Sequence, residues 1–346
     1  MMEWQNTNAK DNEQGSGDHA SQGKGVIPAV EPGEKELTEK IDGIQENIKD
    51  LTKQFEGNVK PLAEEPNLLI PTSELVPELN RMERIEVARR SSPRAVIVLE
   101  AIREEGEREL QRSPLALAIS ALAAGLSMGF SMMAQGLLHT VLPVPFWGTF
   151  IENFGYSLGF VIVVLGRQQL FTENTLTVIV PFFAHPNRRT FWLIVRLWTL
   201  VLVANLVGAL IFATVVAHTA LFPLPIRHSF AEIAQHSLRG GFGLTILRGI
   251  FAGWLIALMV WLLPAADGTR LHIVILITYI VALGGFAHIV AGSVDVLYLV
   301  NIGAASWTTF FVGFMFPTLI GNILGGVMLV AMLNFGQVAA EKLGNG

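Results

Sequence analysis

The chain has 346 residues, of which 51% are hydrophobic and only 15% are charged, and its formal net charge at pH 7 is −5. The charged fraction is well below the roughly 25% typical of soluble domains, which argues against an ordinary soluble protein. Because there is no cysteine, disulfides, thiolate metal sites and cysteine catalysis are excluded. Most charged residues precede residue 113, so the composition predicts a polar N-terminal extension followed by one membrane domain.

The N-terminal extension begins with residues 1–33, which are rich in Gly, Ser, Asn, Gln and acidic residues. Such a composition predicts a disordered tail. Residues 34–60 then carry apolar residues at alternating spacings of four and three, at Leu37, Ile41, Ile44, Ile48, Leu51 and Phe55. This spacing is typical of a short coiled coil that supports oligomerisation, and a single amphipathic helix is the alternative.

Two further segments connect this extension to the membrane domain. Residues 61–92 are predicted to be a linker with a short helix, because prolines recur in them, at Pro61, Pro66 and Pro71. Residues 93–112 mix apolar and charged residues and end just before Pro114. We interpret them as an interfacial amphipathic helix that lies along the bilayer surface or against a pore mouth. An ordinary soluble amphipathic helix is the alternative.

Residues 113–338 form the predicted transmembrane domain, and residues 339–346 a C-terminal tail. Six apolar segments in the domain reach the roughly 20 residues that a helix needs to cross about 30 Å of hydrocarbon. They are 114–141, 148–183, 190–217, 243–264, 271–301 and 307–335. Arginines crowd before the first segment, whereas the loops after the first and fifth segments have no Lys or Arg. The positive-inside rule therefore predicts a multi-pass protein of the inner or plasma membrane with both termini in the cytoplasm.

Two of the six segments are interrupted in the middle by glycine and polar residues. The second contains Gly166-Arg-Gln-Gln-Leu-Phe-Thr-Glu-Asn, and the fifth contains Gly284-Gly-Phe-Ala-His288-Ile-Val-Ala. A broken helix at bilayer depth must be covered by protein or line a polar cavity, because hydrocarbon offers its backbone no hydrogen-bond partner. Paired interruptions in the two halves of a membrane protein indicate a permeation site.

The two halves of the membrane domain have the pattern of two copies of one unit. An Asn-x-x-Gly motif occurs in the third segment, at Asn205, and again in the sixth, at Asn322. Phe171 and His288 each lie 34 residues before one of these asparagines, so they are predicted to be equivalent and to face each other across one pore. With three spans in each copy, the copies insert with opposite topology. The predicted fold is therefore all-α, with six transmembrane helices in an inverted 3+3 repeat and two broken helices.

The two asparagines are expected to hydrogen-bond the backbone that the breaks set free. Interhelical hydrogen bonding and direct contact with the pore are the alternatives for Asn205 and Asn322, and the sequence leaves them open.

The two break segments and the stretch Gly321-Asn-Ile-Leu-Gly-Gly resemble the signature segments of the formate/nitrite transporter family. The resemblance covers residues 93–338. It implies an aquaporin-like protomer, assembly as a homopentamer with one pore per protomer, and passage of small monovalent anions of weak acids.

The resemblance also implies roles for individual residues. His288 matches the family's central histidine, which suits an anion pore because a histidine can carry a charge or exchange a proton near neutral pH. Leu170, Phe171 and Thr172 match the family's first-break loop, where Phe171 forms an apolar constriction and Thr172 offers a hydroxyl to the substrate or the histidine. Tyr156 and Phe160 align with the cytoplasmic constriction, and Val281 stands where a large residue completes the opposite one. The alternatives are a histidine that only bridges helices and a phenylalanine that only packs.

The chain departs from the family at four polar positions. Ala287 replaces a glutamate before the histidine, Gly292 and Gly253 replace asparagines, and Ser237 aligns near a lysine that His236 or Arg239 could substitute. These departures leave open a larger or less charged substrate, or a slower pore.

The predicted function is a channel or transporter for small monocarboxylate or nitrite-like anions, passive or proton-coupled. Two alternatives remain: a facilitator of neutral small solutes, and a membrane scaffold with a vestigial pore. The expected partners are the anion, the lipid bilayer and further copies of the chain. No enzymatic activity, cofactor, metal or nucleic acid is expected, because the sequence has no catalytic triad, phosphate-binding loop or metal-ligand motif.

Overall fold

The computed structural model describes residues 32–58, 80–90, 93–142, 145–266 and 268–344. The chain divides into two compact units, Met1–Glu83 and Arg84–Gly346. In the first unit, helix α1 runs from Pro32 to Asn58, over the stretch with the coiled-coil spacing. Its apolar residues Ile44, Ile48 and Leu51 are exposed on the single chain. The coiled coil itself stays a prediction.

The remaining predictions for the extension lie partly outside the described residues. The disordered tail predicted for residues 1–33 lies outside the described residues except at positions 32 and 33, which belong to α1. Most of the predicted linker also lies outside the described residues. A short helix, α3, runs from Arg81 to Arg90 within it.

Helix α4, Ala95–Gln111, is the amphipathic helix predicted before the first span, and it packs on the end of the helical bundle. Its buried face consists of Val98, Ile102, Gly106 and Leu110. A Cβ added at Gly106 would lie 2.0 Å from the main-chain oxygen of Thr177, so only glycine permits this close approach. The charged face is held together by i, i+3 and i, i+4 ion pairs of Arg103 with Glu100 and Glu107. These carboxylates raise the pKa of Arg103.

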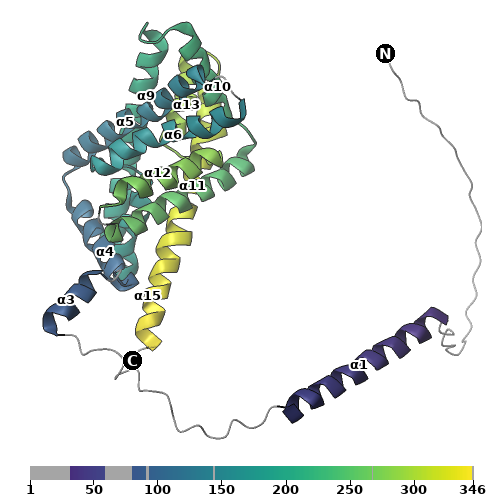
Figure 1. The fold of residues 1–346 in the computed structure, drawn as a ribbon. Coiled ribbons are helices and arrows are strands. Elements are labelled where there is room, and N and C mark those ends of the chain that lie inside the picture. Colours follow the sequence, from purple (N-terminus) through teal and green to yellow (C-terminus); the bar gives the residue numbers. More distant parts are fainter. Residues whose placement is uncertain (1–31, 59–79, 91–92, 143–144, 267, 345–346) are drawn as a thin grey trace, which may run out of the picture. The chain divides into compact units, whose positions relative to one another are not determined.

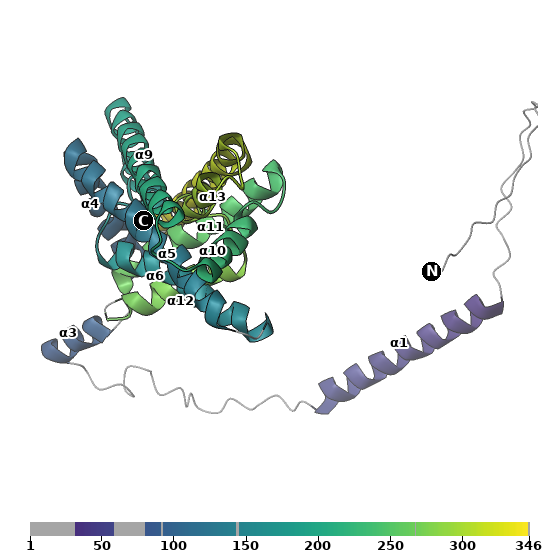
Figure 2. The same cartoon turned by 90° about the horizontal axis from the view of Figure 1, so that it is seen from above.

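The second unit is a bundle of apolar helices (Figures 1 and 2). Its helices before the last span are α5 (Pro114–Val141), α6 (Pro145–Leu165), α7 (Asn174–Thr177), α8 (Ile179–Ala184), α9 (Arg188–His218), α10 (Leu224–Ser237), α11 (Phe242–Leu262), a 3₁₀ turn η1 (Leu263–Ala265), α12 (Arg270–Leu283) and α13 (Ala291–Asn301). The last span is continuous from Thr309 to Gly344, with π-helical stretches η2 (Thr309–Met315) and η3 (Leu324–Met332) around α14 (Phe316–Ile323) and before α15 (Leu333–Gly344). This helix continues into the predicted C-terminal tail.

Five of these helices are long and apolar enough to cross a membrane, and the predicted fifth span is the pair α12 and α13. Large apolar side chains are exposed along their outer faces, as at Val203, Val207 and Ile211 of α9. Exposure of this kind suits lipid rather than water. The two halves interlock, because α12 packs on α6 and α13 packs on α9. Helix α10 lies at the end of the bundle opposite α4 (Figure 1).

Candidate functional site

Both broken helices end in the same backbone turn. After α6, Gln168 N–H donates to the oxygen of Val163, and Arg167 adopts φ 53°. After α12, Phe286 N–H donates to the oxygen of Val281, and Gly285 adopts φ 58°. A left-handed residue followed by this six-residue hydrogen bond is the Schellman motif, which terminates a helix. The two breaks are therefore built alike.

One buried asparagine holds each break loop, as expected. Asn205 Oδ1 accepts from Phe171 N–H at 3.0 Å, and its amide donates to the oxygens of Ala121 at 2.7 Å and Gln169 at 2.9 Å. Asn322 repeats this arrangement, accepting from Ile289 N–H at 2.9 Å and donating to Gly249 O at 2.8 Å and Ala287 O at 2.9 Å. These bonds satisfy backbone groups that hydrocarbon would leave without partners.

The paired bonds correct the predicted alignment of the repeats by one residue. Asn205 contacts the residue 34 positions before it, Phe171, whereas Asn322 contacts the residue 33 positions before it, Ile289. Phe171 is therefore equivalent to Ile289, and His288 is equivalent to Leu170. The prediction that Phe171 and His288 are equivalent is wrong. The Phe171 ring packs edge-on against Trp198, with centroids 5.8 Å apart.

His288 instead faces Thr172, and their hydrogen bond joins the two breaks. His288 Nε2 lies 2.7 Å from Thr172 Oγ1, and both side chains are buried. On the other side of the ring, Ala291 N–H donates to His288 Nδ1 at 3.2 Å. A main-chain N–H can only donate, so Nδ1 carries no proton, and the neutral ring has its proton on Nε2. This proton points at the oxygen of Thr172.

A column of aromatic rings leads to this pair. The rings of Tyr156 and Phe160 have centroids 5.2 Å apart, and the Phe160 ring meets the His288 ring edge-on at 4.9 Å. Phe160 and Leu170 are fully buried, and Tyr156 is 9% exposed. Apolar rings thus separate His288 from solvent on this side.

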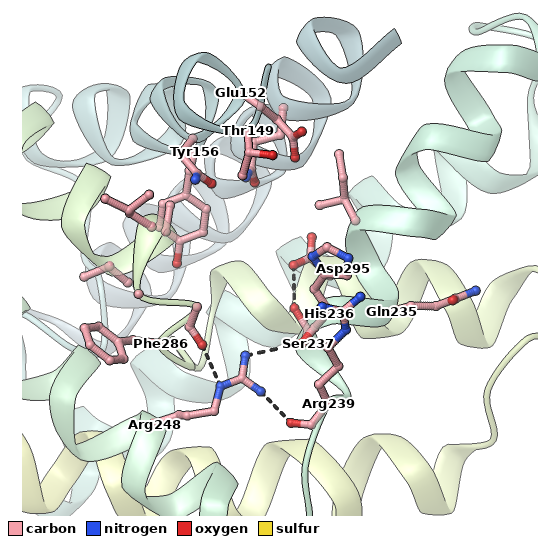
Figure 3. Close-up of a pocket in the computed structure, with 18 of the residues that line it drawn as sticks. Thr149, Glu152, Tyr156, Gln235, His236, Ser237, Arg239, Arg248, Phe286 and Asp295 are labelled. Atoms are coloured by element: carbon pink, nitrogen blue, oxygen red, sulfur yellow. Dashed lines mark hydrogen bonds between the residues drawn. The ribbon is translucent and has the colours of Figure 1, made fainter. Parts of the chain in front are cut away.

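Tyr156 forms part of the wall of a cavity of about 800 Å³ at the α10 end of the bundle. Figure 3 shows Thr149, Glu152 and Tyr156 of α6 on one side, opposite a wall of mostly polar residues. That wall includes Gln235, His236, Ser237, Arg239, Arg248, Phe286 and Asp295.

Val281 lines the same cavity as Tyr156. The predicted assignment of these two residues to opposite constrictions is therefore wrong. After α12 ends, the chain folds back from Gly285 to reach His288, so the end of α12 lies on the cavity side of the histidine.

Polar contacts in and around the cavity bring acidic and basic groups together. His139, near the end of α5, bridges Glu152 of α6 at 2.8 Å and Glu232 of α10 at 3.1 Å. Because the carboxylates bind opposite ring nitrogens, they do not converge on one point. Within the described ranges no group of His, Asp and Glu residues could hold a metal ion. Ser237 donates to Asp295 Oδ2 at 2.9 Å. Burial lowers the pKa of His236 on α10, and the positive charge of Arg239 lowers it further.

Arg248 of α11 is a half-exposed cation in the wall of this cavity, and the sequence patterns did not point to it. Its guanidinium donates to three main-chain oxygens, those of Gly285 at 2.6 Å, Arg239 at 2.6 Å and His236 at 3.3 Å. Glu152 was missed as well. The sequence signal for both residues was an ionisable side chain inside an apolar span. Burying such a charge in a membrane costs free energy, so these side chains mark functional sites by default.

Packing explains two of the departures from the family pattern. A Cβ added at Gly253 would lie 2.3 Å from the oxygen of Asn322, and one added at Gly292 would lie 2.4 Å from the Phe314 ring. An asparagine at either position would therefore clash in this structure, and Phe314 occupies space beside the second break. His236, Ser237 and Arg239, near which the resemblance implies a lysine, all line the cavity.

Comparisons with known proteins agree with this architecture. The model of the family described as formate/nitrite transporter matches residues 96–336. The chain is 42% identical over 264 residues to inner membrane protein YfdC of Escherichia coli, an alignment that covers 75% of this chain and 84% of YfdC. It is 26% identical over 247 residues to the formate channel BtFdhC of Bacillus thuringiensis, covering 69% of this chain and 93% of that protein.

Solved structures show the same fold. A pentameric formate channel with formate bound matches with a TM-score of 0.58 and 22% identity, covering 65% of this chain and 98% of that one. An ion channel of the same family matches with a TM-score of 0.60 and 17% identity, covering 70% and 99%. The chain is thus a multi-pass membrane protein with an aquaporin-like protomer, and it belongs to the formate/nitrite transporter family.

Proposed function

We propose that this chain is a channel or transporter for small monovalent anions of weak acids, of the formate or nitrite kind. The observation that carries the proposal is the hydrogen bond between His288 and Thr172, which joins the two breaks inside the bundle. Relatives and solved structures of the family are named as formate channels, which supports the same substrate class. Transport rather than catalysis is the activity that the family implies.

In this proposal the anion enters the cavity and passes the rings of Tyr156 and Phe160 to reach His288 and Thr172. Val281 widens the cavity side, and Leu170 and Phe171 supply the apolar wall on the far side. An anion loses several kcal/mol or more of hydration in such a dry passage, so a polar partner at its centre is needed. Asn205 and Asn322 act indirectly, by fixing the loops.

The His288–Thr172 pair distinguishes two versions of the mechanism. Thr172 Oγ1 accepts the Nε2 proton, and its own hydroxyl hydrogen has no acceptor among the described residues. That hydrogen is available to an anion oxygen, so the neutral pair serves as a hydrogen-bond donor for passive transport. A proton-coupled cycle requires a second proton at Nδ1, and this proton would displace the hydrogen bond from Ala291.

Uptake by proteoliposomes tests the proposal. The purified protein is given labelled formate, nitrite, acetate, lactate or hydrosulfide at several pH values. His288→Asn is expected to abolish pH-dependent uptake while the protein still assembles, because asparagine keeps a hydrogen bond but cannot carry a proton. His272→Asn, in the first turn of α12 and away from the column, is the matched control. An unchanged pH profile in His288→Asn would show that the histidine is structural.

A second candidate function is facilitated passage of a neutral small solute. The carboxyl groups of Glu152 and Asp295 line the cavity, and they oppose the entry of an anion when ionised. Uptake of urea or glycerol without uptake of any anion would favour this function. If the wild-type protein takes up neither class, the pore is vestigial and the chain serves as a membrane scaffold.

We also propose assembly as a homopentamer in the inner or plasma membrane with both termini in the cytoplasm, which makes the cavity face outward. A solved family member is pentameric, which supports the assembly. Native mass spectrometry of the full chain in detergent is expected to show five copies, and also after deletion of residues 1–60, since α1 would add only a secondary contact. Monomers or dimers of the full chain would contradict the proposal.

A further inference from the structure

Arg248 is an arginine within an apolar membrane helix, α11, and such a residue needs partners that offset the loss of water around its charge. It makes no ion pair within the described ranges. All three acceptors of its guanidinium are main-chain oxygens (Figure 3). The side chain is therefore anchored to backbone rather than to a carboxylate.

One of these oxygens belongs to the end of a helix, and a second lies in the turn directly after one. The oxygen of His236 lies in the last turn of α10, which ends at Ser237, and that of Gly285 lies just after α12, which ends at Leu283. Carbonyls at helix C-termini lack intrahelical donors and carry partial negative charge, so they are good partners for a cation. One guanidinium thus joins the last turn of α10 to the loop that follows α12.

Arg248 also holds the second break through its main chain. Ala287 N–H donates to the oxygen of Arg248 at 3.2 Å, while the Arg248 side chain binds the oxygen of Gly285 at 2.6 Å. These two contacts lie on either side of Phe286, and His288 is the next residue after Ala287. The backbone that leads into the histidine is therefore fixed from one residue of α11.

The first repeat performs the same task with a smaller residue. Ser120 precedes Ala121, the partner of Asn205, as Arg248 precedes Gly249, the partner of Asn322. Ser120 Oγ accepts from Gln169 N–H at 3.1 Å, the position equivalent to Ala287. Among the described contacts, the connection to the end of α10 is made in the second repeat, by Arg248.

We propose that Arg248 is a positioning residue for His288: it holds the second break loop against the end of α10 so that the imidazole meets Thr172. This inference rests on the proposed function, in which the His288–Thr172 pair serves the transported anion. The competing role is capture of the anion in the cavity, since three of the five guanidinium N–H groups are used by the described residues and two remain.

The two roles predict different kinetics for Arg248→Lys, which keeps the charge but has all its donors on one nitrogen and cannot reach three separated oxygens. If Arg248 positions His288, the maximal uptake rate falls about tenfold and the half-saturating concentration changes by less than about twofold. Arg196→Lys is the matched control, because Arg196 also donates to main-chain oxygens at a helix end, those of Leu110 and Arg112, away from both breaks. It is expected to keep the wild-type rate. A wild-type rate in Arg248→Lys, or a raised half-saturating concentration alone, would overturn the proposal.

Hydrogen–deuterium exchange tests the positioning without transport. In Arg248→Lys, amides of residues 284–290 are expected to exchange faster, whereas those of the equivalent loop, residues 166–173, keep wild-type rates. If Arg248→Lys changed the exchange rates of both loops by the same factor, or of neither, the result would contradict the proposal. Should this variant not fold, Gly285→Ala disturbs the same loop, because alanine is strained at φ 58°, and it is expected to lower the maximal rate in the same way. Absence of uptake by the wild-type protein would remove the proposed function and leave the exchange result to decide on Arg248.

Discussion

The two break loops share one backbone design and differ in almost every side chain. Each has the same helix-ending turn and the same three hydrogen bonds to a buried asparagine. In the first loop, however, polar residues stand where the second has alanine, valine and glycine. Gln169 is matched by Ala287, Thr172 by Val290, and Asn174 by Gly292. The reverse holds at one position, where Leu170 is matched by His288.

This difference separates the residues that build the pore from those that give it chemistry. Within the first loop, Asn174 donates to Gln169 Oε1 at 3.1 Å and to Leu170 O at 3.2 Å, whereas Arg167 pairs with Glu105 of α4. Thr172 alone reaches the other loop in the described contacts, at His288. The duplicated backbone provides the two helix breaks. The His288–Thr172 pair arises at positions where the side chains of the two copies differ.

The largest effect is expected from removal of the shared framework. Asn205→Ala and Asn322→Ala each leave one N–H and one carbonyl group of a break loop buried without partners, at about 1–3 kcal/mol for each group. The second carbonyl in each set lies inside a helix, α5 or α11, and keeps its intrahelical donor. The two variants should lose similar stability, because the bonds are equivalent in the two repeats. A fall in thermal midpoint on the order of 10 °C or more is expected for each in detergent-purified protein. Asn334→Ala, which removes one bond near the end of the last helix, is the control.

A clear difference between the two asparagine variants would break the comparison. It would mean that one loop is held mainly by other contacts, and Arg248 in the second loop is the first residue to examine by a double-mutant cycle.

A smaller effect is expected at the equivalent positions Phe171 and Ile289, which are both buried. Phe171→Ala should destabilise by about 3–5 kcal/mol, because the ring loses its contact with Trp198. As part of the proposed apolar wall, its removal should also raise flux per assembled protein and weaken discrimination among small anions. Ile289→Ala should be destabilised without altered discrimination. Thermal midpoints and uptake measured on the same preparations check both.

Lower flux together with a large loss of stability in Phe171→Ala would limit this residue to packing. It would also show that only the side of the pore with Tyr156 and Phe160 is closed by aromatic rings.

Much of this architecture is predictable from sequence because the membrane imposes strict rules on backbone. Apolar segments of sufficient length gave the spans, and glycines with polar residues inside them gave the breaks. The asparagines could be identified because an amide side chain in a membrane helix needs hydrogen-bond partners, and the broken helices supply free backbone groups. His288 stood out as an ionisable residue at bilayer depth.

Two predictions were wrong, the equivalence of Phe171 with His288 and the placement of Tyr156 and Val281 on opposite sides of the pore. The repeats differ by one residue between break and asparagine, a change that connecting segments tolerate, so equal counting misplaced Phe171 opposite His288. Tyr156 was put on the side opposite Val281 because the packing of α6 against α12 cannot be read from the order of residues. The role of Arg248 depends on three segments that meet only in space.

The smallest expected effect concerns pH and lies on the side of the second break. His236 is the α10 residue whose main-chain oxygen accepts from Arg248. Burial lowers the pKa of its imidazole, and Arg239 lowers it further, so the folded protein favours the neutral ring. The unfolded chain, with an ordinary histidine pKa of about 6.5, then binds more protons than the folded one in acid. The stabilising contribution is therefore complete above about pH 6.5 and is lost as pH falls through the folded pKa.

His236→Gln removes this contribution and should flatten the fall in thermal midpoint between about pH 7.5 and 5.5 relative to the wild-type protein. High salt screens Arg239 but not burial, so it should reduce the difference between the two proteins without abolishing it. The first loop has no histidine, which confines the effect to the α10 side. An identical pH slope in His236→Gln would show that protonation at α10 is not coupled to folding, and Arg248 would then hold the second break independently of pH.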